Sequence, residues 1–262
     1  MADFQHIKTK VEDNIGTLTL ASPPVNALSP AVLKEIDAAL DQFKAQKVRA
    51  VIITGSGANA FCAGADVKAM REFETNPAKA AEFLQQGVDV FNKIENFPAP
   101  VLCAINNLTL GGGLELALAC DIRISSDRAR FGLPEVTLGL IPAWGGTARL
   151  PRVVGIGNAK EIIYTGQLIN AQQATKINLV NKVVPDGDEV RAALDIAKRI
   201  AGKASPVAVR NAKQAINEGI GVPIEQALAA SEKVVGEVMT SSDLREGITA
   251  FVEKRPPSFK GE

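Results

Sequence analysis

Residues 109–121 read TLGGGLELALACD, and this stretch is the strongest indication of the fold in the sequence. Three consecutive glycines at positions 111–113 open an apolar helix that carries one carboxylate, Glu115. Glycine loses more conformational entropy on folding than any other residue, so three in a row indicate that the backbone closely approaches another group. Two interpretations remain open: tight packing of a helix against a strand, or free amides that face a negatively charged oxygen.

A second segment with small residues strengthens the latter interpretation. Residues 60–66 read AFCAGAD and place Ala63, Gly64 and Ala65 where backbone amides can be exposed. One amide from each segment, directed at a single point, would stabilise an oxyanion. The helix that starts near Gly113 would add the positive end of its dipole to that point.

Two carboxylates are candidates for acid and base chemistry. Glu115 lies in the first helical turn, where the dipole and the free amides favour its ionised form, so it is a candidate base. Glu135, in FGLPEVTLG (residues 131–139), follows a proline and has apolar neighbours, so partial burial raises its pKa and favours an acid's role. The alternative is two unrelated structural glutamates.

Composition limits the class of protein. The 262 residues are 46 % hydrophobic and 22 % charged with zero formal net charge, which is ordinary for a globular domain and disfavours nucleic-acid binding. No apolar run approaches the roughly 20 residues needed to cross a bilayer, and residues 1–14 do not resemble a secretory signal. Cys62, Cys103 and Cys120 are expected as buried thiols, so a cytoplasmic protein without a membrane partner is predicted.

The order of elements predicts an α/β fold. A hairpin is expected within residues 4–20, a helix after Ser29 and Pro30, buried strands at 49–54 and 100–105, and a long helix at about 78–97. Strands are expected in DIRISS and ARFG, and mainly helices from Trp144 onward. Strands become rare near Asp188, which marks a domain boundary.

Other candidate residues receive simpler interpretations. GSGANA at residues 55–60 lacks the long helix and the later acidic residue of a dinucleotide site, and the single histidine, His6, is interpreted as structural. Trp144 and Tyr164 are interpreted as packing residues and not as recognition residues. Three cations are expected at the solvated surface: Lys68, Arg149 and Lys254. Lys68 follows the first glycine loop and is also placed to contact a phosphate.

Several motifs together resemble the crotonase superfamily of enoyl-CoA hydratases and isomerases. They occur in the family's order and cover nearly the whole chain: PPVNALS, AFCAGADVKAM, GGGLELALACDIRI, ARFGLPEVTLGLIPAWGGTARLPR, ATKINLVNKVV and DLREGITAFVEKRPPSFKGE. The resemblance implies a crotonase-like spiral of strand-strand-helix units in residues 1–190 and a C-terminal helical trimerisation region in residues 191–262. A homotrimer or a dimer of trimers is therefore expected.

The resemblance also assigns roles to individual residues. It implies that the amides of Ala65 and Gly112 form an oxyanion hole for the thioester carbonyl of an acyl-CoA, and that Glu115 and Glu135 are the catalytic pair of a hydratase. Coenzyme A is part of the substrate, so neither a separate cofactor nor a metal is expected. The residues implied to border coenzyme A are Val25, Ala27, Ala63, Asp66, Val67, Lys68, Phe251 and Lys254.

The expected reaction is reversible addition of water to a trans-2-enoyl-CoA, which gives a 3-hydroxyacyl-CoA. Alternatives on the same fold need only one glutamate: a Δ3-Δ2 enoyl-CoA isomerase, an acyl-CoA decarboxylase or a hydrolase. A noncatalytic binder, for example of RNA, is the alternative from another class. Ala143 stands where the family often has glycine, and with Trp144 beside it the preferred acyl chain length stays open.

Overall fold

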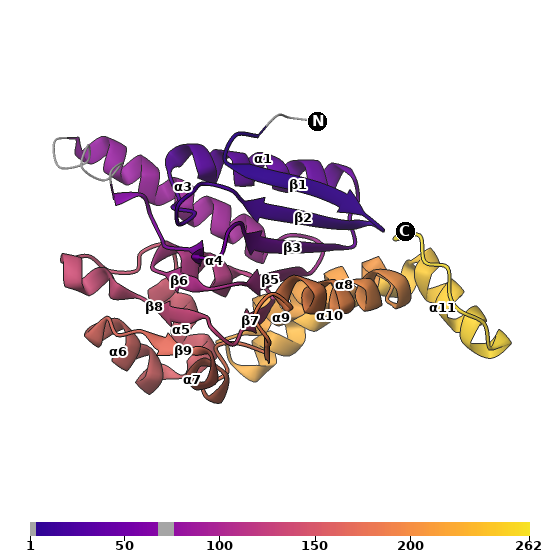
Figure 1. Cartoon of the computed structure of the whole chain (residues 1–262). Coiled ribbons are helices and arrows are strands. Elements are labelled where there is room, and N and C mark those ends of the chain that lie inside the picture. Colours follow the sequence, from indigo (N-terminus) through magenta and orange to yellow (C-terminus); the bar gives the residue numbers. More distant parts are fainter. Residues whose placement is uncertain (1–3, 68–75) are drawn as a thin grey trace.

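A repeated strand-strand-helix unit builds two β-sheets in the computed structural model, which describes residues 4–67 and 76–262 (Figure 1). The larger sheet has the order β1-β2-β3-β5-β7-β10 and the smaller one β4-β6-β8-β9. The strands of the larger sheet are β1 (Ile7–Glu12), β2 (Ile15–Leu20), β3 (Ala50–Gly55), β5 (Val101–Ile105), β7 (Ile122–Ser126) and β10 (Lys182–Val184). Those of the smaller sheet are β4 (Ala60–Cys62), β6 (Leu108–Leu110), β8 (Arg130–Gly132) and β9 (Ile169–Asn170).

The path of the chain is a spiral. The successive pairs β3 and β4, β5 and β6, and β7 and β8 each place one strand in the larger sheet and the next in the smaller one. In the larger sheet β5 is parallel to β3 and β7, and in the smaller sheet β6 is parallel to β4 and β8. Parallel strands require a crossover connection between them. The predicted α/β spiral of strand-strand-helix units is confirmed.

The predicted hairpin is also present at the start of the chain. β1 and β2 are antiparallel and paired from Ile7 opposite Leu20 to Glu12 opposite Ile15. The turn between them uses Asp13 and Asn14, both with positive φ, a conformation that short polar side chains tolerate. The hairpin places β1 at the edge of the larger sheet.

Helices cover both faces of this sheet. On one face lie α1 (Pro30–Ala45), capped by the Ser29 hydroxyl as predicted, and α3 (Pro77–Glu95). On the other face α8 (Glu189–Lys203) packs its alanines against β3 and β5. Because α8 begins at the proposed domain boundary and packs on the sheet, the packed core continues past residue 190. The division into two domains stays a prediction.

The glycine-opened helix is α4 (Gly112–Ala119), and all of its residues are buried. A Cβ on Gly113 would overlap the carbonyl oxygen of Cys62, so this glycine allows the helix to pack closely against β4. At the other end of α4, the buried Arg123 side chain donates to the carbonyl oxygens of Cys120 and Ala117. A cation at the C-terminus of a helix favourably opposes the helix dipole.

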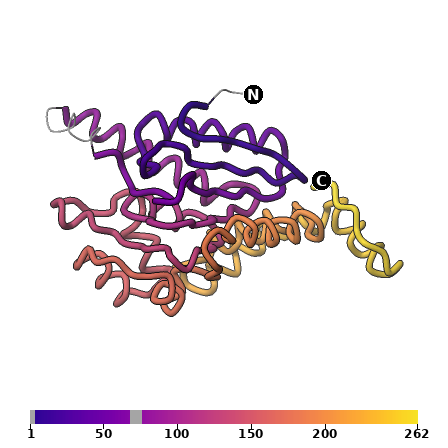
Figure 2. The backbone as a smooth tube through the Cα atoms, in the orientation of Figure 1, coloured from indigo at the N-terminus to yellow at the C-terminus, as the bar shows by residue number. Residues whose placement is uncertain are grey.

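The second half of the chain is mainly helical, as predicted. Besides α8, its helices after β8 are the 3₁₀ helix η2 (Pro134–Leu138), α5 (Gly146–Val154), α6 (Ile156–Thr165), α7 (Ala171–Lys176), α9 (Pro206–Gly219), α10 (Ile224–Thr240) and α11 (Ser242–Glu253). α9 and α10 lie side by side, and α11 extends away from the body of the molecule (Figures 1 and 2).

Two further expectations can be compared with the structure. Cys62, Cys103 and Cys120 are free and buried, as predicted. Of the helices in the described part of the chain, none has the length and apolar character that a membrane span requires.

Candidate active site

The two segments predicted to supply amides do meet. Leu28 donates to the Gly64 carbonyl and accepts from the Asp66 amide, so backbone bonds hold both neighbours of Ala65. A Cβ built on Gly64 would lie 3.3 Å from the Gly112 nitrogen, and one built on Gly112 would lie 3.4 Å from the Ala65 nitrogen. Neither the Ala65 nor the Gly112 amide donates a backbone bond to another described residue. The two close amides therefore suit an oxyanion hole, and that role stays a prediction.

Glu115 lies one turn into α4 and is only 2 % exposed. One carboxylate oxygen, Oε1, accepts from the Gly146 amide at 2.7 Å. Burial raises the pKa of Glu115 to about 7, although hydrogen bonds from the Gly146 and Trp144 amides oppose the shift. The expectation that the helix start would favour the ionised form is therefore wrong in direction, because the loss of hydration outweighs the dipole and the amides.

Glu135 approaches the same place from η2. Its Oε1 would lie 3.0 Å from a Cβ on Gly111, and its Oε2 is buried without a hydrogen-bond partner among the described residues. Burial raises the pKa of Glu135, as predicted. The charge of Glu135 also raises the pKa of Glu115, so the two carboxylates are near enough to interact. An unpartnered buried acceptor suits a water molecule or a substrate.

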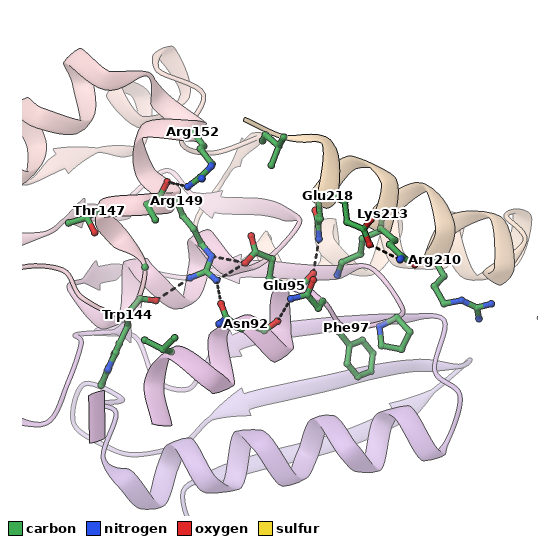
Figure 3. Close-up of a pocket in the computed structure, with 18 of the residues that line it drawn as sticks. Asn92, Glu95, Phe97, Trp144, Thr147, Arg149, Arg152, Arg210, Lys213 and Glu218 are labelled. Carbon is green, nitrogen blue, oxygen red and sulfur yellow. Dashed lines mark hydrogen bonds and ion pairs between the residues drawn. The ribbon is translucent and has the colours of Figure 1, made fainter. Parts of the chain in front are cut away.

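Arg149 fixes the loop that holds Glu115. The guanidinium donates to the Trp144 carbonyl at 3.1 Å, to Asn92 Oδ1 at 2.7 Å and, through two nitrogens, to Glu95 Oε2 (Figure 3). Its side chain is only 11 % exposed, so the expectation of a solvated surface charge is wrong. Sequence reasoning missed the network because its α3 partners lie more than 50 residues earlier in the chain.

The two predicted packing aromatics differ. The Trp144 ring lies edge-on to Phe83 and Phe91 of α3, with ring centroids 5.0 and 5.6 Å apart, so its packing role is confirmed. A Cβ on Gly112 would lie 2.6 Å from Trp144 Cζ3, so the indole also borders the start of α4. Tyr164 on α6 is 70 % exposed, so the packing role predicted for it is wrong.

Most of the residues predicted to border coenzyme A lie on two segments that run side by side. The Ala63 amide donates to the Val25 carbonyl at 3.0 Å, so residues 25–28 and 63–66 run side by side and bring Ala27 and Asp66 to the same place. Val67 follows and is 60 % exposed. Asn26, which was not singled out, is buried between these segments with positive φ and donates to the carbonyls of Ala60 and Phe61. The sequence pattern that could have identified Asn26 is a single asparagine within an apolar loop.

Two further predicted residues, Phe251 and Lys254, are not brought to the site within one chain. Phe251 is 84 % exposed on α11 and Lys254 ends that helix, while α4 lies in the body of the molecule (Figure 1). Lys68 lies outside the described residues. The binding roles of all three stay predictions.

Comparisons with known proteins agree with the fold. Residues 10–262 match the family described as enoyl-CoA hydratase/isomerase. The chain is 42 % identical to the short-chain-enoyl-CoA hydratase of Clostridium acetobutylicum, covering 97 % of each chain, and 42 % identical to the mitochondrial methylglutaconyl-CoA hydratase of Mus musculus, covering 99 % of this chain and 84 % of that one.

A solved structure gives the same result. The crystal structure of enoyl-CoA hydratase from Bacillus anthracis has a TM-score of 0.93 and 41 % identity, covering 98 % of this chain and all of that one. Sequence and structure therefore agree over almost the whole length, and the chain belongs to the enoyl-CoA hydratase/isomerase family.

Proposed function

We propose that this protein is an enoyl-CoA hydratase that reversibly adds water to a trans-2-enoyl-CoA to give the 3-hydroxyacyl-CoA. The observation that carries the proposal is the pair Glu115 and Glu135, one buried and one partly buried carboxyl with raised pKa values, beside two backbone amides that donate to no other described residue. A reaction that needs one carboxylate would not require both.

The two amides stabilise the charge that develops in the reaction. As water adds, negative charge moves onto the thioester carbonyl oxygen, and the amides of Ala65 and Gly112 donate to that oxygen. Fixed donors in a site shielded from water need no reorganisation, and losing one such donor typically costs about 2.7–4 kcal/mol. No added cofactor is needed in this step.

The two glutamates divide the proton transfers. Glu115, held by the Gly146 amide, takes a proton from the water as its oxygen attacks the β-carbon. Glu135 supplies a proton to the α-carbon, so one hydroxyl and one hydrogen are added in total. A pKa of about 7 for Glu115 suits a base that works near neutral pH.

The proposal extends to substrate binding and assembly. Coenzyme A lies along residues 25–28 and 63–67, and Lys68 contacts a phosphate. Phe251 and Lys254 reach coenzyme A of a neighbouring subunit in a homotrimer or a dimer of trimers, and the exposed apolar residues of α10 and α11 support this assembly. The three free thiols support a cytoplasmic location.

The test is hydration of crotonyl-CoA, followed as loss of the absorbance of its conjugated thioester. The unmodified protein should consume the absorbance, and Glu115→Gln and Glu135→Gln should each slow it by roughly two or more orders of magnitude with acyl-CoA affinity retained. Glu82→Gln, at an exposed position of α3, is the matched control.

Three results would contradict the proposal. One is a folded protein that leaves the absorbance unchanged with enoyl-CoAs of several lengths. Another is near-normal turnover in either catalytic variant. A gain of absorbance with a 3-enoyl-CoA, without hydration, would instead identify an isomerase.

A further inference from the structure

The indole of Trp144 fills the space between α3 and α4. It is 5 % exposed, lies edge-on to Phe83 and Phe91, and packs so closely on Gly87 that a Cβ there would overlap the ring. No side chain projects from Gly87 into this space, so α3 accommodates the ring. A large aromatic side chain thus occupies a volume that a smaller residue would leave open.

This volume directly adjoins the two free amides. The Cβ position of Gly112 lies 2.6 Å from Trp144 Cζ3 and 3.4 Å from the Ala65 nitrogen. The indole and the proposed oxyanion hole therefore both border the Cβ position of one glycine. A thioester carbonyl bound to the amides would bring its acyl group within reach of the ring.

Two other groups near the amides in the described part of the chain have proposed roles of their own. Glu135 lies against Gly111 and interacts with Glu115, and an alkyl chain gains nothing from contact with carboxylates. Residues 25–28 and 63–66 form the edge proposed for coenzyme A. The apolar direction left among the described residues leads toward Phe83, Gly87 and Phe91, where the indole lies.

We infer that Trp144 is the end wall of the acyl pocket and restricts this enzyme to short acyl groups. The inference rests on the proposed function, because it concerns the acyl group of the same substrate. Trp144 acts by excluding volume and exchanges no proton with the substrate. Its backbone amide contacts Glu115, and that contact does not depend on which side chain the residue carries.

Binding of saturated acyl-CoAs from butanoyl to decanoyl, measured by calorimetry, tests the wall without any turnover. Each additional methylene buried in an open pocket should tighten binding about fourfold. In the unmodified protein, affinity should stop rising after the first few carbons. In Trp144→Ala it should continue to rise, with at least a tenfold gain from hexanoyl to decanoyl-CoA.

Two further variants keep the test decisive. Trp144→Leu retains more packing if the alanine variant unfolds, and it should show the same trend with a smaller gain. Tyr164→Ala removes an exposed aromatic from α6 and should leave the ladder of affinities unchanged.

Two outcomes would overturn the inference: the same dependence on chain length in the unmodified protein and the Trp144 variants, or continued tightening up to decanoyl-CoA in the unmodified protein. A normal ladder of affinities without hydration of crotonyl-CoA would contradict the proposed function alone. The two proposals can therefore fail separately.

Discussion

At the scale of a single residue, Glu115 shows how a buried carboxyl is kept partly protonated at neutral pH. Burial removes water from the carboxylate and raises its pKa, while the amides of Gly146 and Trp144 and the charge of Arg149 restrain the rise. The residue therefore lowers folding stability in its charged form, and that cost should appear in the pH dependence of stability.

Glu115→Gln tests this. Because the pKa of Glu115 rises from 4.5 to about 7 on folding, the folded chain binds more protons than the unfolded chain between those values, and its stability falls as pH rises through that window. Glutamine does not titrate, so the variant should exceed the unmodified protein in stability at pH 8 by up to about 3 kcal/mol. At pH 4.5 the gain should be lost.

Urea unfolding of both proteins at the two pH values, at equal protein concentration, measures the difference. Glu82→Gln is again the control and should show no such pH-dependent gain. An equal effect of Glu115→Gln at both pH values would show that burial does not set the pKa of Glu115.

At the scale of elements, the loop before α5 joins α3 to α4. Its Trp144 carbonyl accepts from Arg149, which is fixed by Glu95 and Asn92 of α3, while the Gly146 amide that follows the loop donates to Glu115 of α4. The orientation of the Glu115 carboxyl thus depends on an ion pair outside the site. Arg149 is a positioning residue, since it contacts Glu115 only through this loop and through its charge.

Arg149→Met should lower kcat for crotonyl-CoA roughly tenfold, because misplacing a catalytic group is costly. It should also move the acid limb of the pH profile upward, since the charge of Arg149 lowers the pKa of Glu115. Arg152→Met, on the same helix, is the control, because Arg152 is exposed and donates to Ala148. An unchanged pH profile in Arg149→Met would contradict the predicted effect of the Arg149 charge on the pKa of Glu115.

Gly113 provides a prediction for α4 itself. Alanine there would place its Cβ against the backbone carbonyl of Cys62, which cannot move without displacing β4. Gly113→Ala should therefore destabilise the protein by about 1–3 kcal/mol or more. Gly202→Ala in α8 has open space around it and should be neutral or stabilising. Thermal unfolding compares the two, and equal melting temperatures would contradict the close approach.

Sequence patterns were sufficient where the physical cause is local. The Ser29 and Pro30 helix start, the Asn14 turn and the glycines of α4 were predicted because caps, turns and close approaches restrict residue type at one position. Arg149 and the pKa of Glu115 were predicted wrongly. Both depend on burial by elements distant in the chain, and neither residue's neighbours in sequence report that burial.

At the scale of the whole molecule, the C-terminal helices leave apolar surface uncovered in a single chain. The exposed side chains include Ile216 on α9, Ile224, Leu228 and Met239 on α10, and Phe251 on α11. Large exposed apolar side chains are expected at surfaces that other chains cover. Their number on these helices is consistent with the proposed trimer.

Light scattering after size exclusion should give three or six times the chain mass of 27.6 kDa. Leu228→Lys should shift the mass toward that of one chain, because a buried, unpaired charge opposes association. Lys8→Glu changes an exposed charge on β1 and should leave the mass unchanged. A single-chain mass for the unmodified protein would contradict the assembly.

The position of Trp144 has one more consequence, for how this enzyme can evolve. Its peptide group interacts with the Glu115 carboxyl, whereas its ring faces α3, so the two contacts belong to separate parts of one residue. Every amino acid except proline supplies the same peptide N–H. A single substitution at position 144 should therefore change which acyl groups fit the proposed pocket. The backbone interaction with Glu115 would be retained.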